Sequence, residues 1–393
     1  MSSEAVIVDV IRSPSGRGKH GGALAGVHPA DVLAQVLRAL LTRNDLDPAL
    51  VDDVIGGCVT QSGEQSTNIT RTALLSAGFP DSVPGVTVDR QCGSSQQAAT
   101  FAAQGVIAGS YDIVIACGVE SMSRSPLGSN TTGLDPHGAL LHERYPDGLI
   151  GQGVSAELVA DRWNLGREEL DAYAARSHRL AAENAASGFF DADLIPIDTP
   201  AGLVDRDETI RPGTTVEGLA ALKPAFRTDA LAARFPELDW RITAGNSSPL
   251  TDGASAALIM RAERAEALGL TPRARFRGFA VTGSDPLLML TGVIPATQRV
   301  LQRTGLSLDD IDAFEINEAF ASVPLAWQHE LGADPDKLNP RGGAIALGHA
   351  LGSSGTRLLG TLLAHLEATG GTLGLQSMCE GGGMANATII ERL

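Results

Sequence analysis

The sequence predicts an α/β protein built from two similar halves. Short runs of β-branched residues alternate with longer segments whose apolar residues recur with helical period, which is typical of this class. In the first half we expect strands at 5–11, 51–59, 83–88 and 112–118, a helix from Pro29 and a helix at 93–109. The last helix consists mostly of small residues, so we expect it to be buried against neighbouring backbone.

An internal repeat supports the arrangement in two halves. Residues 46–57 (LDPALVDDVIGG) resemble residues 306–317 (LSLDDIDAFEIN) at an offset of 260. Gly-Ser-Ser occurs at 93–95 and, near the same offset, at 352–354. Chance similarity between two helix–turn–strand units is the alternative. If the repeat is real, two copies of one fold pack around a pseudo-two-fold axis, and their equivalent loops face each other across one site.

An inserted segment interrupts the first half. From about Pro126 to Gly245 the chain is rich in Gly, Asp and Pro, and it contains one clear helical hairpin at 155–185. Strand–helix alternation resumes at Thr251, with a helix from Ala262. The predicted domains are residues 1–120 plus 246–270, the inserted residues 121–245, and residues 271–393.

Composition and charge exclude several classes of protein. An apolar fraction of 43% in 393 residues argues against disorder, and a net charge of −16 disfavours nucleic acid and anionic lipid as partners. No apolar run approaches the length of a membrane span, and no secretory signal is recognisable, so we expect a cytoplasmic protein. The cysteines and histidines never cluster at metal-ligand spacing, so no metal is expected.

A glycine motif near the N-terminus does not predict a nucleotide site. Gly16, Gly18 and Gly21 match the dinucleotide fingerprint GxGxxG. That mechanism needs a helix that opens at the third glycine, and no helix is expected before Pro29. No phosphate-binding P-loop motif occurs either. Nicotinamide, flavin and nucleoside triphosphates are therefore not expected as cofactors.

Two of the four cysteines are candidates for chemistry. Cys92 lies between a predicted strand and the helix that begins at Gly93, where a helix N-terminus lowers a thiol pKa toward neutrality and the glycine would let a substrate approach. Cys379 ends a strand and precedes three glycines, whose exposed N–H groups are typical of an oxyanion hole. The alternative for each is a buried structural cysteine. Cys58 and Cys117 lie in apolar strands and are interpreted as structural.

A histidine and an asparagine complete the candidate chemistry. His349 lies in segment 342–355, which is expected to be strand-like and to feed a glycine-flanked loop that leaves the imidazole accessible. By the repeat, this loop is the counterpart of the Cys92 loop. Asn317 and Glu318 close a strand, where α/β sheets place functional groups, although a turn with a helix cap is the alternative. Two thiols and an imidazole on facing loops indicate nucleophilic catalysis on an acyl group.

The segments around these residues resemble the four signature blocks of the thiolase family. They are VDRQCGSSQQA, NEAFA, GGAIALGHALG and CEGGGMAN, and the similarity extends over essentially the whole chain. The nearest resemblance is to actinobacterial thiolases of sterol or fatty-acid degradation. It implies a five-layered αβαβα thiolase fold, in which two similar halves related by a pseudo-two-fold carry an inserted loop domain over the active site.

The resemblance also implies a role for each candidate. Cys92 would be the acylated nucleophile, His349 would take its proton, and Cys379 would be the acid/base for the acetyl-CoA carbanion, with a pKa near the working pH. Asn317 would hold a water that forms one oxyanion hole with His349. The backbone N–H groups of Cys92 and Gly381 would form the second.

Coenzyme A is the implied co-substrate, and no permanently bound cofactor is expected. Ser248 would contact its pantetheine arm. Basic residues of the inserted segment would attract its phosphates, although a solvated face is the alternative: Arg206, Arg211, Lys223, Arg227, Arg234 and Arg241. Lys223 and Arg227 are the predicted contacts. A homodimer or homotetramer is expected.

The expected reaction is cleavage of a 3-ketoacyl-CoA by CoA to acetyl-CoA and a shortened acyl-CoA. One alternative is an acetyl-CoA C-acetyltransferase that makes acetoacetyl-CoA. A decarboxylating condensing enzyme would use a second histidine or an asparagine in place of Cys379, and a non-catalytic lipid carrier would not need both cysteines.

Three positions depart from the usual pattern: Ala350 replaces a proline, Asp89 an asparagine, and Gln152 a methionine beside the acyl pocket. A polar Gln152 would suit a substrate that carries oxygens or a ring.

Overall fold

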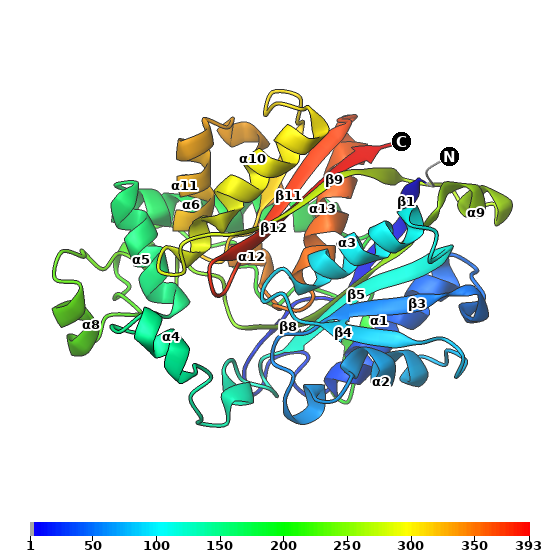
Figure 1. Cartoon of the computed structure of the whole chain (residues 1–393), viewed down its shortest axis with the longest axis horizontal. Coiled ribbons are helices and arrows are strands. Elements are labelled where there is room, and N and C mark those ends of the chain that lie inside the picture. Colours follow the sequence, from blue (N-terminus) through cyan, green and yellow to red (C-terminus); the bar gives the residue numbers. More distant parts are fainter. Residues whose placement is uncertain (1–3) are drawn as a thin grey trace.

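The computed structural model describes residues 4–393 and contains a ten-stranded mixed sheet with helices on both faces (Figure 1). Its strands are β1 (Ala5–Arg12), β2 (Gly16–Arg17), β3 (Asp53–Gly57), β4 (Gly85–Val88), β5 (Ile113–Ser121), β8 (Thr251–Arg261), β9 (Ala274–Gly283), β10 (Ala313–Ile316), β11 (Leu373–Glu380) and β12 (Met384–Arg392). A separate hairpin pairs β6 (Ile197–Thr199) with β7 (Gly202–Val204). The helices are α1 (Pro29–Arg43), α2 (Ile69–Ser76), α3 (Ser94–Ile107), α4 (Ala139–Arg144), α5 (Gln152–Arg162), α6 (Arg167–Ala186), α7 (Val216–Ala220), α8 (Asp229–Arg234), α9 (Ala262–Ala267), α10 (Val293–Thr304), α11 (Ser322–Leu331), α12 (Ala344–Leu347) and α13 (Ser354–Thr369).

The large sheet consists of two halves with the same strand pattern. In the first half β3 and β5 are parallel, and β5–β8 and β8–β1 are antiparallel. In the second half β10 and β11 are parallel, and β11–β12 and β12–β9 are antiparallel. The halves join where β1 pairs with β9. β3, α3 and β5 begin at residues 53, 94 and 113, and β10, α13 and β11 begin at 313, 354 and 373, which confirms the 260-residue repeat.

The helices and the two halves of the sheet form five layers, α-β-α-β-α, as expected, with buried side chains between them. The two central helices, α3 and α13, pack against each other between the halves of the sheet, with Ala98 and Leu359 in their shared core. Successive residues of β5 face opposite sides, because Val114 joins this central core and Ile115 joins the core beneath α1 and α2. Helices α10 and α11 cover the outer face of the second half. Both faces of β1, β5, β8 and β11 are therefore buried, which explains their continuous apolar runs.

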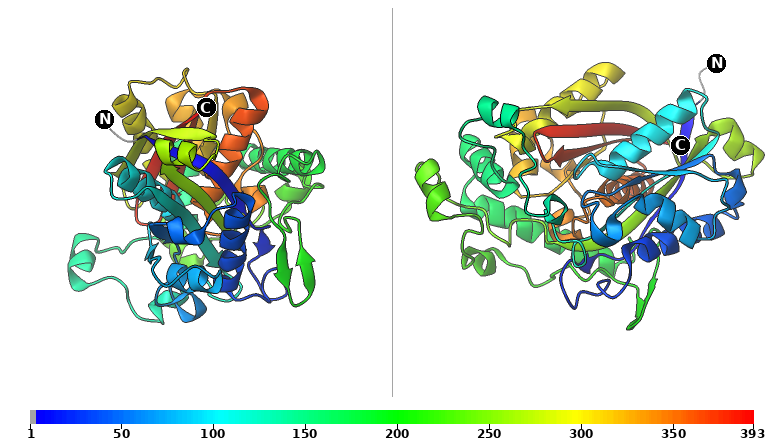
Figure 2. Two further views of the ribbon diagram at one scale, coloured as in Figure 1. Left: turned by 90° about the vertical axis from the view of Figure 1, so that its right-hand side faces the viewer. Right: turned by 60° about the horizontal axis from the view of Figure 1, so that its bottom comes forward.

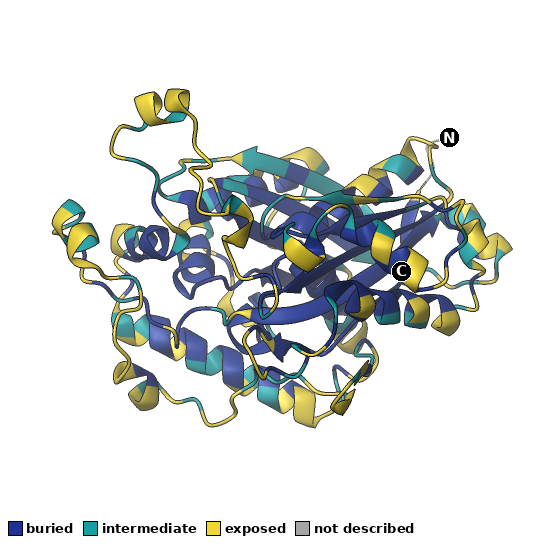
Figure 3. Ribbon diagram, turned by 90° about the horizontal axis from the view of Figure 1, so that it is seen from below, coloured by how far each residue is buried: buried dark blue, intermediate teal, exposed yellow. Residues whose placement is uncertain are grey.

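The inserted segment carries the helices α4 to α8 and the β6–β7 hairpin, which projects from the body of the molecule (Figure 2). Its two longer helices, α5 and α6, pack against α11 and α12 and contribute Val159 and Leu170 to the core of the second half. Exposed residues concentrate on the outlying loops and short helices, whereas the strands and central helices are buried (Figure 3). No helix of residues 4–393 has the length and apolarity that a membrane span requires. The three-part division of the chain stays a prediction.

The expectation of a strand-like segment at 342–355 is wrong. Residues Ala344–Leu347 form the short helix α12, which begins after Gly343 and ends at Gly348, where φ is +85°. The backbone N–H of Ile345 donates to the buried carboxylate of Glu318, at 3.1 Å. That contact fixes the first turn of α12, and the left-handed glycine then turns the chain so that His349 follows directly.

Candidate active site

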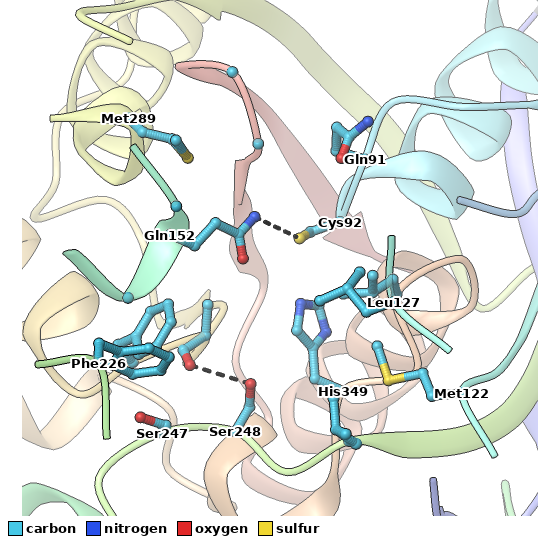
Figure 4. Close-up of a pocket in the computed structure, with 18 of the residues that line it drawn as sticks. Gln91, Cys92, Met122, Leu127, Gln152, Phe226, Ser247, Ser248, Met289 and His349 are labelled. Carbon is cyan, nitrogen blue, oxygen red and sulfur yellow. Dashed lines mark hydrogen bonds between the residues drawn. The ribbon is translucent and has the colours of Figure 1, made fainter. Parts of the chain in front are cut away.

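The candidate site is a cavity of about 760 Å³ between the two halves of the sheet and the inserted segment (Figure 4). Its wall is formed by residues from several separate stretches of the chain, and these are Gln91, Cys92, Met122, Leu127, Ile150 to Gly153, Phe226, Ser247 to Leu250, Met289, Ala319, Phe320, His349, Leu351, Gly381, Gly382 and Met384. Cys92, His349, Gly381 and Ser248 therefore share one cavity, as the sequence predicted.

A strained turn presents Cys92 to the cavity. Gln91 has a left-handed backbone, with φ of +48°, and its N–H donates to Asp89 Oδ1 at 2.7 Å. Ser94 Oγ donates to the carbonyl of Gln91 at 2.6 Å, which ties the turn to the start of α3. Asp89 thus supplies the acceptor that an asparagine side chain would supply, so this departure from the family pattern preserves the turn.

Gly93 makes room for a neighbouring carboxyl group. A Cβ at this position would lie 2.0 Å from Glu380 Oε1 and 2.7 Å from Asn386 Nδ2. The expectation that Gly93 opens a path for substrate is wrong, because Glu380 fills the space. Glu380 is fully buried, and neither of its carboxyl oxygens has a hydrogen-bond partner within residues 4–393. Burial raises its pKa to about 9, so it is a neutral acid at pH 7.

The expectation of a low pKa for Cys92 is also wrong. The residue is 2% exposed, and burial, followed by repulsion from Glu380 once that acid is ionised above about pH 9, raises the pKa of its thiol to about 12. The N–H group of Gln152 works in the opposite direction. Cys92 is therefore a neutral thiol at neutral pH, and it needs a base to become a nucleophile.

Hydrogen bonds assign the tautomer of His349. Ser354 Oγ donates its proton to the carbonyl oxygen of Ala350 at 2.8 Å, so this hydroxyl accepts from Nδ1–H of His349, at 2.7 Å. The other ring nitrogen, Nε2, is then the unprotonated acceptor, and it lies 3.3 Å from Nδ2 of Asn317. The sequence reasoning missed Ser354, although its position at the start of the helix after the histidine loop was a signal.

The imidazole of His349 is a neutral base. It is only 4% exposed, so the expectation of an openly accessible side chain holds only toward the cavity. Burial, followed by the charge of Arg357, lowers its pKa to about 3. A neutral ring with a free lone pair on Nε2 can accept a proton from a thiol.

Asn317 and Cys379 lie behind the cavity wall. Asn317 follows β10, and its backbone N–H donates to Ser377 of the neighbouring strand at 3.0 Å. Its side-chain oxygen is buried without a partner in the described chain, so a polar atom of a ligand or water can be held there. Cys379 is fully buried, and burial together with Cys92 raises its pKa well above the usual value. It is therefore a stable thiol, not a group that titrates near neutral pH.

Glu318 holds this side of the site together. Its buried carboxylate accepts hydrogen bonds from Tyr173 Oη (3.0 Å), Ser177 Oγ (2.7 Å) and Asn339 Nδ2 (3.0 Å), besides Ile345. It thus links α6, α12 and the end of β10. The sequence left open whether Asn317 and Glu318 are functional or only form a turn with a helix cap. The structure gives Glu318 a structural role and places Asn317 against the imidazole of His349.

The residues expected to bind CoA lie in different places. Ser248 lines the cavity, with its hydroxyl donating to the carbonyl of Ala319 at 3.1 Å. Lys223 and Arg227 are exposed on either side of the Pro224–Phe226 stretch, whose Phe226 forms part of the wall.

The six basic residues of the inserted segment have different surroundings, and their contact with CoA stays a prediction. Arg206 lines a separate cavity beside α6, Arg234 donates to the carbonyl of Gly148, and Arg241 pairs with Asp239. Within residues 4–393 no group of three or more His, Cys, Asp or Glu side chains is arranged to hold a metal ion.

Comparison with known proteins agrees with this geometry. Residues 5–263 match the family model for the thiolase N-terminal domain, and residues 270–392 match that for the thiolase C-terminal domain. The chain therefore belongs to the thiolase family, whose members are acyltransferase enzymes.

Individual relatives match over nearly their full length. The chain is 47% identical to the steroid 3-ketoacyl-CoA thiolase FadA6 of Mycobacterium tuberculosis, covering 100% of this chain and 95% of that protein. It is 44% identical to a 3-ketoacyl-CoA thiolase of Saccharophagus degradans, covering 99% and 98%. The crystal structure of the Bacillus anthracis acetyl-CoA acetyltransferase superposes with a TM-score of 0.88 at 39% identity, covering 100% of this chain and 99% of that chain.

Proposed function

We propose that this enzyme is a 3-ketoacyl-CoA thiolase that cleaves its substrate with CoA to give acetyl-CoA and a shortened acyl-CoA. One observation carries the proposal. Cys92 and His349 line one cavity, and Asn317 and Cys379, from two further segments, lie behind its wall; the two thiols are protonated and the imidazole is neutral. That is the protonation state from which a β-keto thioester can be attacked and its carbanion quenched.

In the first step the Cys92 proton moves to Nε2 of His349, and the sulfur attacks the keto carbon. The carbon–carbon bond then breaks, and its electron pair leaves on the acetyl-CoA carbanion, which takes the proton of Cys379. His349 carries N–H on Nε2 after accepting the proton, so it can donate to the developing oxyanion together with a water held by Asn317. An acyl group remains on Cys92.

In the second step CoA gives its thiol proton to the Cys379 thiolate and attacks the acyl carbon. The Cys92 sulfur leaves and recovers its proton from His349, which restores the starting state. The N–H groups of Cys92 and Gly381 are the proposed donors to the oxyanion of this step, because both residues line the cavity.

The cavity favours substrates larger than acetoacetyl-CoA. Its volume of about 760 Å³ and its apolar side chains, including Met122, Leu127, Phe226 and Met289, suit a long or ring-bearing acyl group. The steroid thiolase named among the relatives makes a ring-bearing substrate a natural first choice.

Binding of CoA, assembly and location complete the proposal. CoA is a co-substrate, with Ser248 on its pantetheine arm and Lys223 and Arg227 on its phosphates.

The exposed apolar side chains beside edge strand β4 support a homodimer or homotetramer, and they are Leu75, Val86, Phe101 and Ile107. The four free cysteines fit a reducing compartment, the cytoplasm.

The test is a substrate series. Purified enzyme is mixed with CoA and 3-ketoacyl-CoAs of increasing chain length or with a ring, and loss of the enolate absorbance is followed. We expect kcat/KM to rise from acetoacetyl-CoA to the larger substrates. A clear preference for acetoacetyl-CoA would favour the acetyltransferase, and full activity in a Cys92→Ser variant would refute the acyl-enzyme.

A further inference from the structure

The side-chain amide of Gln152 reaches the sulfur of Cys92. Gln152 is the first residue of α5, and its Nε2 lies 4.0 Å from Cys92 Sγ, with the N–H group directed at the sulfur (Figure 4). Within residues 4–393 this is the one side-chain hydrogen bond that the sulfur receives. The distance is at the outer limit for a hydrogen bond to sulfur and shortens readily when the sulfur becomes charged.

The amide is placed by the glycine turn that follows β11. A Cβ on Gly381 would lie 3.0 Å from Gln91 Oε1, a tight approach, and 3.4 Å from Gln152 Nε2, an ordinary contact, so the Gln152 amide packs directly against this turn. The wall on the other side of Gln152 is apolar, with Phe226 and Met289. Gln152 is thus a polar group at the point where the reacting sulfur, the glycine turn and the acyl pocket meet.

Besides Gln152, only the backbone N–H of Cys92 stabilises an anion on its sulfur until His349 takes up the proton. Burial removes water from the sulfur, and a negative charge there is opposed by the charges of Glu120 and, above about pH 9, of Glu380. His349 is neutral, and Cys379 is itself a buried thiol. A buried thiolate without donors is costly, and hydrogen bonds to charged groups are stronger than those to neutral ones.

We propose that Gln152 is a further catalytic residue, whose N–H group stabilises the Cys92 thiolate while His349 holds the proton. After acylation, the same N–H group contacts the thioester on that sulfur. No covalent bond of Gln152 changes, because the proton moves only between Sγ of Cys92 and Nε2 of His349. The methionine that is usual at this position fills the same space without donating a hydrogen bond. The inference rests on the proposed role of Cys92 as the nucleophile.

The test measures the thiolate directly on the whole enzyme without CoA. Wild type, Gln152→Met, Gln152→Leu and Gln152→Glu are alkylated with iodoacetamide from pH 6 to 10, and the modified Cys92 peptide is followed by mass spectrometry. The pKa of Cys92, about 12, lies above this range, so the rates are compared at each pH, and we expect Gln152→Met to be alkylated about tenfold more slowly than wild type. Gln152→Leu should match it, and Gln152→Glu should be slower still.

Two outcomes overturn the role of Gln152. One is a Gln152→Met profile that coincides with wild type. The other is an effect of leucine but not of methionine, which would mean that the side chain only packs. With a 3-ketoacyl-CoA, Gln152→Met should lower kcat while KM for CoA changes less than about twofold. A shifted alkylation profile in an enzyme without thiolysis would overturn the proposed function, whereas normal cleavage with an unshifted profile would overturn only this inference.

Discussion

Ser354 Oγ lies 2.7 Å from Nδ1 of His349 and makes Nε2 the nitrogen that faces Asn317 and the cavity. Ser354→Ala removes the acceptor for Nδ1–H, so the ring loses both its orientation and its preferred tautomer. We expect kcat to fall about tenfold to a hundredfold with little change in KM, because one buried hydrogen bond is lost. Steady-state kinetics on one 3-ketoacyl-CoA measure this.

The neighbouring serine offers the control. Ser353 Oγ donates only to the carbonyl of Ala350, at 3.3 Å, and does not touch the imidazole. Ser353→Ala should therefore keep kcat within about twofold of wild type. An equal loss in both variants would mean that the helix start matters and the tautomer does not.

Cys379→Ser separates the two halves of the reaction. A serine hydroxyl is a far weaker acid than a thiol, so cleavage of the carbon–carbon bond should fall by at least about a hundredfold. Cys92 should still be acylated by acetyl-CoA, since that transfer needs no carbanion. Intact mass spectrometry detects the acetyl adduct, and Cys92→Ser, which lacks the acceptor sulfur, is the control. Absence of the adduct from Cys379→Ser would contradict this division of labour.

Glu380→Gln tests the buried acid beside Gly93. Its folded pKa of about 9 is above the value of 4.5 for a free glutamic acid, so wild type loses stability as the pH rises from about 4.5 to about 9. The amide of the variant does not titrate. The melting temperature of Glu380→Gln relative to wild type should therefore increase with pH, by about 2 °C or more between pH 5 and pH 9. A difference that is constant with pH would show that this carboxyl group is ionised in the folded enzyme.

Glu318→Ala should destabilise the fold. It leaves the donors of Tyr173, Ser177, Asn339 and Ile345 without their buried acceptor, which costs about 3 kcal/mol or more of unfolding free energy. Chemical denaturation measures the loss. The control is Glu183→Ala, in which an exposed carboxylate leaves a surface pair with Arg179 and should change the stability by less than about 0.5 kcal/mol. Comparable losses of unfolding free energy in both variants would argue against a stabilising role for the hydrogen bonds that Glu318 accepts.

Lys223→Ala and Arg227→Ala should raise KM for CoA about threefold to tenfold and leave kcat unchanged. Each removes an exposed positive charge next to the Phe226 wall, and such charges act mainly on binding. The control is Arg206→Ala, because Arg206 lines a different cavity. An increase in KM for the control alone would move the phosphate site to that second cavity.

The sequence by itself determined the class and the repeat, and it predicted the four candidate residues Cys92, Asn317, His349 and Cys379. The spacing of apolar residues along the chain predicts which segments are helices and which are strands. The 260-residue offset relates the Cys92 loop to the His349 loop from the order of residues alone. Cys, His and Asn at the ends of elements are visible as residue types, so the kind of chemistry could be predicted.

Only the tertiary structure decided how those groups are charged and held. Burial and Glu380 reverse the expected pKa shift of Cys92, and the hydrogen bond from Gln152 reaches a sulfur that is far from it in the sequence. The helical α12 also follows from a distant carboxylate, that of Glu318. Electric charge, desolvation and hydrogen bonding depend on distances in space, and the linear order of residues does not contain those distances.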